Sequence, residues 1–165
     1  MNIHQQIIFL ALIRIWIIFI GYFSGNYYRS EIDLYLENNG ISYWMIPFIK
    51  FMFVYDSRYF LEVIKLGYSY DMIHAFMPGF PALVRIITMF RSLTLGELAL
   101  AIFMINFIIN VGIIFYMNKL IKLITKNPFI HSLSLKFFLL SPVTIYYTSS
   151  YSECLFLFIQ TFGIF

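Results

Sequence analysis

The sequence predicts an all-α polytopic membrane protein, because of its low charge and its long apolar runs. Of its 165 residues, 61% are hydrophobic and only 12% are charged, whereas soluble domains have about 25% charged residues. So little polar surface cannot cover a soluble fold. The apolar runs are much longer than the roughly ten-residue alternating strands of a membrane barrel, so helices are expected to satisfy the backbone groups in lipid.

The charge and the cysteine content exclude several classes of function. The net charge of +3 is small and its cations are scattered, so no nucleic-acid partner is expected. The single cysteine, Cys154, excludes an internal disulfide framework. No cluster of His, Cys and carboxylate residues has the spacing of metal ligands, so no metal is expected.

The first apolar segment covers residues 7–23. It could be a signal peptide or a retained signal anchor. No Lys or Arg stands at its start, Arg14 interrupts it, and no clear small-x-small cleavage site follows. These features favour a retained anchor that spans the membrane.

Three further spans are expected in the second half of the chain. Residues 98–117 form an uninterrupted apolar run, residues 133–147 form a run bent at Ser141-Pro142, and residues 155–165 begin an incomplete run. A helix that stopped there would be too short to cross a bilayer. We therefore expect residues 1–165 to be the N-terminal part of one transmembrane domain.

A short basic loop with Lys119, Lys122 and Lys126 separates the second and third spans. The positive-inside rule places this loop in the cytosol. Alternation of the spans then places the long loop 24–97 and the connection 149–153 together on the lumenal side. The long loop is mixed in composition, and its short apolar pieces are expected to form interfacial or re-entrant helices.

Asp56 is the principal candidate for chemistry in the long loop. It directly precedes a predicted helix over residues 57–66, which Gly67 would end. As an N-cap, the Asp56 carboxylate would accept hydrogen bonds from free N–H groups of the first turn. As a catalytic group at the membrane surface, it would take a proton from a substrate hydroxyl. The two roles do not exclude each other.

Three charged residues of the same predicted helix have a structural explanation. Arg58 and Glu62 are four residues apart and Lys65 follows three residues later. These are the spacings of ion pairs on a helix surface. We expect surface pairs here rather than substrate contacts.

An aromatic stretch follows, with Tyr68, Tyr70, Asp71 and His74 close together. Aromatic rings beside a carboxylate suit sugar binding, because a ring can cover the apolar face of a pyranose. Aromatic residues also gather at membrane interfaces, and the stretch taken alone favours that interpretation. His74 by itself does not make a metal site.

Polar residues also occur in the apolar runs. Arg14 lies near the middle of the first span, where a charge is costly and is expected to face a partner, a cavity or an anionic head group. Asn106 and Asn110 are one turn apart, which indicates hydrogen bonds between helices. Glu153 begins the fourth span, where it could favour the helix dipole. Its expected side of the membrane, shared with Asp56, adds it to the candidate site.

Several of these residues form an ordered set of short motifs. The motifs are Tyr55-Asp56 with Phe60-Leu61, Gly67-Tyr68, Tyr70-Asp71, Ala75-Phe76-Met77-Pro78-Gly79-Phe80-Pro81, Ser141-Pro142 and Tyr151-Ser152-Glu153-Cys154-Leu155-Phe156. In this order, the set resembles the GPI mannosyltransferase 2 family, polytopic enzymes of the GT-C superfamily, over nearly the whole chain. That family has Trp, Glu and Phe where this chain has Tyr55, Asp71 and Met77, and its members carry Arg and Asn at the positions of Arg14 and Asn106.

The resemblance implies transfer of the second mannose of a GPI precursor, in alpha-1,6 linkage, from dolichyl-phosphate mannose in the endoplasmic-reticulum lumen. The donor linkage is beta and the product alpha, so one inverting displacement suffices, with a carboxylate activating the attacking oxygen. Asp56 is the implied general base, and no cofactor is implied beyond the donor substrate. The implied substrate-binding residues are Arg14, Tyr68, Tyr70, Asp71, His74, Tyr151, Ser152 and Glu153.

The implied partners are a lipid-linked sugar donor, a GPI glycolipid acceptor and the membrane, and a small membrane partner subunit is left open. Other functions also fit a polytopic chain. They are another polyprenyl-phosphate-sugar-dependent transferase of the GT-C type, a non-catalytic membrane subunit, and a transporter. A transporter is expected to carry its polar residues within the spans rather than in one loop.

Overall fold

The computed structural model describes residues 3–25, 31–50, 56–69, 71–141, 147 and 151–164. Within these ranges the regular elements are helices, and no strand occurs. The predicted all-α class is therefore confirmed.

Two described helices are long and apolar enough to cross a membrane, α1 (Ile3–Gly25) and α6 (Leu95–Ile124). They include the predicted spans over 7–23 and 98–117 and extend beyond both. The start of α6 is set by a capping box, in which the Glu97 N–H donates to Thr94 Oγ1 at 3.3 Å and the Thr94 N–H donates to Glu97 Oε2 at 2.8 Å.

Two shorter apolar helices follow, α7 (Pro128–Leu140) and α8 (Glu153–Gly163). Asn127 caps α7, because its Oδ1 accepts a hydrogen bond from the Phe129 N–H at 2.9 Å. The helix thus begins five residues before the predicted span 133–147. Pro142, at the predicted bend, lies outside the described residues.

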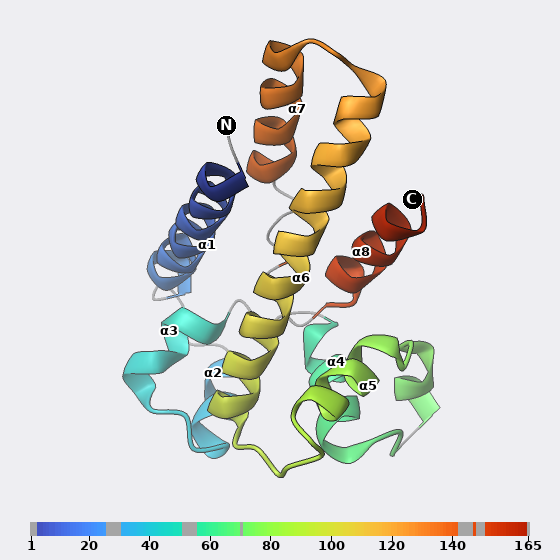
Figure 1. The fold of residues 1–165 in the computed structure, drawn as a ribbon. Helices are drawn as coiled ribbons and strands as arrows, with labels where there is room; N and C mark the ends of the chain where they lie inside the picture. The colour runs from blue at the N-terminus through green and yellow to red at the C-terminus, as the bar shows by residue number, and fades with distance from the viewer. Residues whose placement is uncertain are drawn as a thin grey trace.

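The apolar helices pack around α6, which runs through the molecule (Figure 1). Helix α7 folds back along α6 and α8 lies against it, while α1 contacts both α6 and α7. Gly112 permits the close approach of α8, since a Cβ at this position would lie 2.5 Å from the Phe158 ring. The four helices alternate in direction along the molecule (Figure 1).

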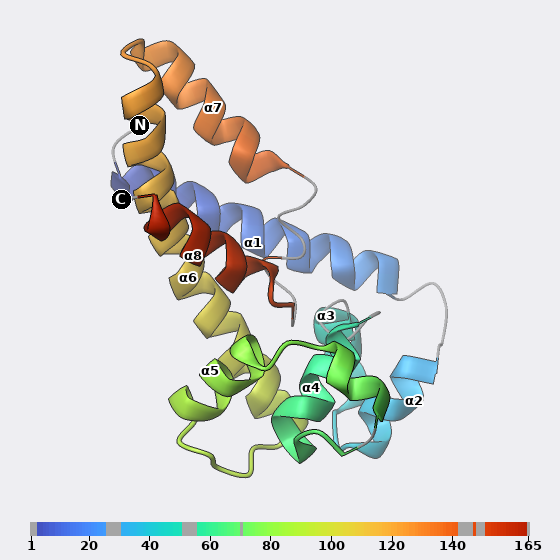
Figure 2. The ribbon, with the colours of Figure 1, turned by 90° about the vertical axis from the view of Figure 1, so that its right-hand side faces the viewer.

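Short helices fill the chain between α1 and α6 and gather at the end where α6 begins (Figure 2). Their apolar side chains form one cluster with the first turns of α6. An ion pair between Lys50 and Asp33, 3.0 Å long, joins two of them. The elements are α2 (Glu31–Asn38), η1 (Tyr43–Met45), α3 (Ile46–Ile49), α4 (Ser57–Leu66), η3 (Asp71–Ala75) and α5 (Gly79–Ile87).

Candidate functional site

The structure places Asp56 directly before α4, whose bounds match the predicted helix. Gly67 ends the helix with a φ of +74°, and its N–H donates to the Val63 carbonyl at 3.0 Å. Asp56 is exposed, and its side chain makes no capping hydrogen bond. Its φ and ψ of −65° and −18° are helical, whereas a capping side chain needs an extended backbone. The prediction that Asp56 caps α4 is therefore wrong. The Asp56 carboxylate is exposed and does not stabilise the helix through a capping hydrogen bond.

Contacts along α4 explain the charged residues near Asp56. Arg58 Nε donates to Glu62 Oε1 at 3.3 Å, which confirms the predicted pair. Lys65 Nζ donates instead to Asn39 Oδ1 at 3.5 Å. The Arg58 guanidinium lies 4.9 Å from the ring centre of Tyr35. Burial, and then the Glu62 carboxylate, raises the pKa of the Tyr35 hydroxyl, while Arg58 lowers it.

The aromatic stretch after α4 folds back on that helix. The Tyr68 hydroxyl donates to the Phe76 carbonyl at 2.6 Å, and the rings of Tyr68 and His74 lie 5.0 Å apart. The Phe76 ring stacks on Tyr59 at 5.0 Å and meets the edge of Phe60 at 5.2 Å. These contacts hold the predicted sugar-binding stretch against the helix that Asp56 begins.

The two polar side chains that follow in the aromatic stretch lie at the surface. Asp71 begins η3, and both Asp71 and His74 are exposed. Tyr70 lies outside the described residues. The aromatic stretch thus presents one carboxylate and one imidazole at the surface.

The Tyr151-Ser152-Glu153 segment meets α4 at the start of α8. Tyr151 is only 6% exposed, and its ring lies 6.4 Å from that of Phe60, one turn after Asp56. Ser152 stands at the N-cap position of α8 without a side-chain cap bond, and Glu153 is exposed at the first position of the helix. The structure therefore brings together two predicted site segments that are far apart in sequence.

Arg14 lies inside the apolar helices and is 2% exposed. Its Nη2 donates to Asn110 Oδ1 on α6 at 2.8 Å. Asn110 Nδ2 in turn lies within hydrogen-bond distance of the carbonyls of Asn106 (2.7 Å) and Tyr147 (3.1 Å) and of Cys154 Sγ (3.2 Å). The expected partner for Arg14 and the expected interhelical bond of Asn110 are both present.

This buried polar cluster connects α1 to the candidate site. Cys154 directly follows Glu153, so Asn110 holds the first turn of α8 next to the exposed carboxylate. Asn110 was predicted only as a helix-packing residue, and its contact with the site depends on long-range packing that spacing alone does not reveal. A second amide pair joins the same two helices, where Gln6 Nε2 donates to Asn118 Oδ1 at 3.1 Å and Asn118 Nδ2 donates back to Gln6 Oε1.

Three predicted site residues present exposed carboxylates on the described part of the chain. These carboxylates belong to Asp56, Asp71 and Glu153. Within the described ranges, no group of three His, Cys, Asp or Glu side chains could hold a metal ion. Proton transfer by a surface carboxylate is the chemistry that this arrangement offers.

Comparison with known proteins connects this arrangement to a family. A family model described as Mannosyltransferase (PIG-V) matches residues 35–165. The matched part includes Asp56, the aromatic stretch and the Tyr151-Ser152-Glu153 segment, while Arg14 precedes it. No curated protein matches the chain. No solved structure matches it either.

Proposed function

Because the chain belongs to the Mannosyltransferase (PIG-V) family of glycosyltransferases, we propose that it transfers the second mannose of a GPI-anchor precursor, in alpha-1,6 linkage, from dolichyl-phosphate mannose. The observation that carries the proposal is the meeting of α4 with the Tyr151-Ser152-Glu153 segment, through the Phe60 and Tyr151 rings. This contact joins two of the motifs of the sequence resemblance, Tyr55-Asp56 with Phe60-Leu61 and the motif that begins at Tyr151, near the end where α6 begins. The reaction would then take place at that membrane surface.

Asp56 is the proposed general base. The acceptor hydroxyl gives its proton to the Asp56 carboxylate while its oxygen bonds to C1 of mannose. The bond from C1 to the phosphate oxygen breaks on the opposite face, and dolichyl phosphate leaves with the electron pair. This single displacement inverts the beta linkage of the donor to an alpha linkage. An exposed carboxylate without a capping bond can approach a substrate hydroxyl.

The leaving phosphate needs charge stabilisation more than protonation. We propose Arg14, one of the implied substrate-binding residues, or an arginine outside residues 1–165 for this role. The bond of Arg14 to Asn110 and the bonds from Asn110 to Tyr147 and Cys154 support a second role, in which Arg14 positions the start of α8.

The reaction is proposed to face the endoplasmic-reticulum lumen. The candidate site lies at the end where α6 begins. At the other end, Lys119 and Lys122 lie in the last turns of α6 rather than in the predicted loop, and Lys126 follows the helix. Basic residues beside a short connection between spans stay in the cytosol, which supports a lumenal position for Asp56.

Direct transfer tests this function. Membranes that contain the full-length protein should move radiolabelled mannose from dolichyl-phosphate mannose to a GPI precursor that carries one mannose. A mannosidase specific for alpha-1,6 linkages should then release the label. GDP-mannose in place of the lipid donor is the control and should give no product. Transfer from another polyprenyl-phosphate sugar, with none from dolichyl-phosphate mannose, would instead establish the alternative transferase.

A further inference from the structure

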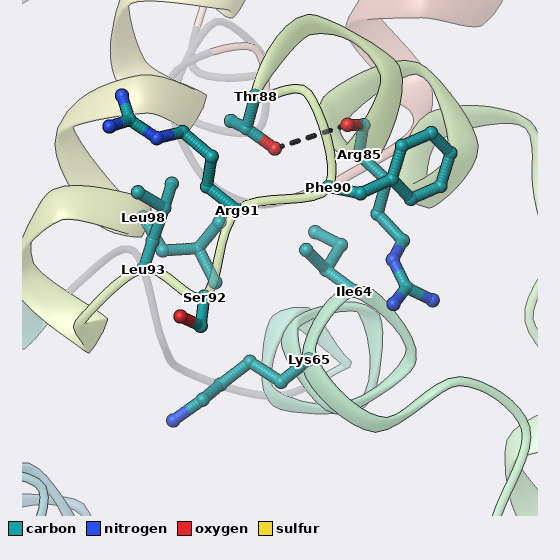
Figure 3. A pocket seen from close by; sticks show the side chains of 9 residues that line it. All are labelled: Ile64, Lys65, Arg85, Thr88, Phe90, Arg91, Ser92, Leu93 and Leu98. Atoms are coloured by element: carbon teal, nitrogen blue, oxygen red, sulfur yellow. Dashed lines mark hydrogen bonds between the residues drawn. The ribbon is translucent and has the colours of Figure 1, made fainter.

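A pocket of about 220 Å³ lies between the end of α4, the end of α5 and the start of α6 (Figure 3). Its lining includes three cationic side chains, Lys65, Arg85 and Arg91, and none of the described residues that line it is acidic. Figure 3 shows the three cationic side chains on different walls of the pocket, with their charged ends extending in different directions. Such a concave group of like charges concentrates a positive potential.

The turn that forms one wall of the pocket has an uncommon backbone. Met89 and Phe90 have φ values of +53° and +55°, a region that residues other than glycine rarely adopt. The Phe90 N–H donates to the Arg85 carbonyl at 2.9 Å and the Met89 N–H to the Ile86 carbonyl at 3.0 Å, which closes α5 where glycine is usual. This turn keeps the Arg85 guanidinium 5.6 Å from the Phe90 ring centre. Such strained positions are often found at binding sites.

The pocket also has an apolar edge next to a membrane-spanning helix. Leu98, in the first turns of α6, lines the pocket. On the adjoining turn, Met89 is 81% exposed, Phe90 is 68% exposed, and Ile86 and Ile87 are also exposed. Cations beside exposed apolar side chains at the start of a span suit the head group and upper acyl chains of an anionic lipid.

We propose that this pocket binds the phosphate of an anionic glycerophospholipid of the surrounding bilayer, with Lys65, Arg85 and Arg91 around the phosphate. The nearby Glu97 carboxylate does not compete with a phosphate for the cations of the pocket. Glu97 interacts electrostatically with Arg91, but its carboxylate accepts hydrogen bonds from the N–H and hydroxyl of Thr94, both at 2.8 Å.

The position of Lys65 on α4 separates the phosphate bound in the pocket from the site of the proposed transfer reaction. Lys65 is at the end of the ten-residue helix that Asp56 precedes, roughly 13 Å from it along the helix axis. This separation of the backbone positions favours a second lipid in the pocket rather than the sugar donor, and lipid binding can be measured without the transfer reaction.

Lipid retention by the purified full-length protein tests the proposal. Native mass spectrometry would compare phosphatidylinositol with phosphatidylcholine for the wild type and for the triple variant Lys65→Gln, Arg85→Gln, Arg91→Gln. We expect the wild type to prefer phosphatidylinositol and the variant to bind it roughly a hundredfold more weakly, about fivefold for each cation. The charge-preserving variant Lys65→Arg, Arg85→Lys, Arg91→Lys should retain most of the binding.

A matched control removes the same charge elsewhere. The triple variant Lys119→Gln, Lys122→Gln, Lys126→Gln changes the opposite end of α6 and should retain the preference. An equal loss in both glutamine variants would overturn the proposal, because net charge would then explain the binding. Displacement of phosphatidylinositol by millimolar inorganic phosphate, or by dolichyl phosphate in preference to phosphatidylserine, would overturn it as well. The first result would indicate a site for free phosphate, and the second a site for the sugar donor.

Discussion

Arg14 Nη2 donates to Asn110 Oδ1 at 2.8 Å, between two helices that are long enough to cross a membrane. A buried arginine is costly in lipid and is usually found where it has a function or a partner. Asn110 accepts from Arg14 with its oxygen and directs its nitrogen to the Tyr147 carbonyl and to Cys154 Sγ. The first helix is thereby connected to the start of α8, beside the candidate site.

A double-mutant cycle should show that Arg14 acts through Asn110. Arg14→Leu, Asn110→Leu and the double variant would be compared in thermal stability and in transfer activity per folded protein. We expect the losses to be clearly less than additive, with a coupling of about 0.6 to 1.7 kcal/mol in stability. Additive losses of activity would mean that Arg14 contacts substrate independently of Asn110.

The Gln6 and Asn118 pair provides the matched control for that cycle. It joins the same two helices through buried amides, about two helical turns further along α6 than Asn110 and so away from the start of α8. Gln6→Leu with Asn118→Leu should show a similar coupling in stability, while activity per folded protein stays within about twofold. If the Gln6 and Asn118 variants lost as much activity as the Arg14 and Asn110 variants, the connection of Asn110 to the start of α8 would not explain the loss.

Gly112 should tolerate larger side chains poorly. A Cβ at this position would lie 2.5 Å from the Phe158 ring, so Gly112→Leu is expected to push α8 away from α6. We expect a loss of about 1 to 3 kcal/mol in the free energy of unfolding, measured by thermal denaturation in detergent. Gly163→Leu is the control, because no side chain or backbone atom of the described residues, apart from its own helix turn and chain neighbours, lies within 4 Å of a Cβ there. Equal effects of the two changes would contradict the packing described for α6 and α8.

Local sequence patterns predicted the helices whose ends and composition depend on neighbouring residues, namely α1, α4 and α6. The end of α4 was predicted from Gly67 and its start from Asp56 as the residue before the helix, while the pair of Arg58 and Glu62 was predicted from their spacing of four. The apolar composition predicted α1 and α6. The capping box of Thr94 and Glu97 starts α6 three residues earlier than the apolar run predicts.

Other features could not be read from local patterns. The bonds of Asn110 to Arg14, Tyr147 and Cys154 join segments far apart in the chain, and no spacing rule predicts such a cluster. The cap bond expected of Asp56 fails because its backbone is already helical. Residue type predicts which side chains can cap a helix, but the backbone φ and ψ of the residue before the helix decide whether its side chain does so.

Thiol accessibility tests the proposed orientation in the membrane. Ser69→Cys and Lys126→Cys, each in a Cys154→Ser background, place single thiols at exposed positions at opposite ends of the helices. In sealed endoplasmic-reticulum vesicles with the cytosolic face outward, an impermeant reagent should label position 126 readily. Position 69 should react only after the vesicles are opened. Labelling of position 69 in sealed vesicles would contradict a lumenal site.

The most direct test of the central claim is mannosyl transfer by Asp56→Asn in the full-length protein, with activity normalised to protein amount. Asn has the same shape as Asp, and no capping bond is lost because Asp56 makes none, so α4 and protein abundance should be unchanged. Glu62→Gln is the control, since Glu62 is explained by its pair with Arg58, and it should remain active. Loss of a general base predicts a rate lower by roughly a hundred- to ten-thousand-fold, about 3 to 5 kcal/mol in the activation free energy. Retention of most of the activity in Asp56→Asn would contradict the account and move the search for the base to Asp71 and Glu153.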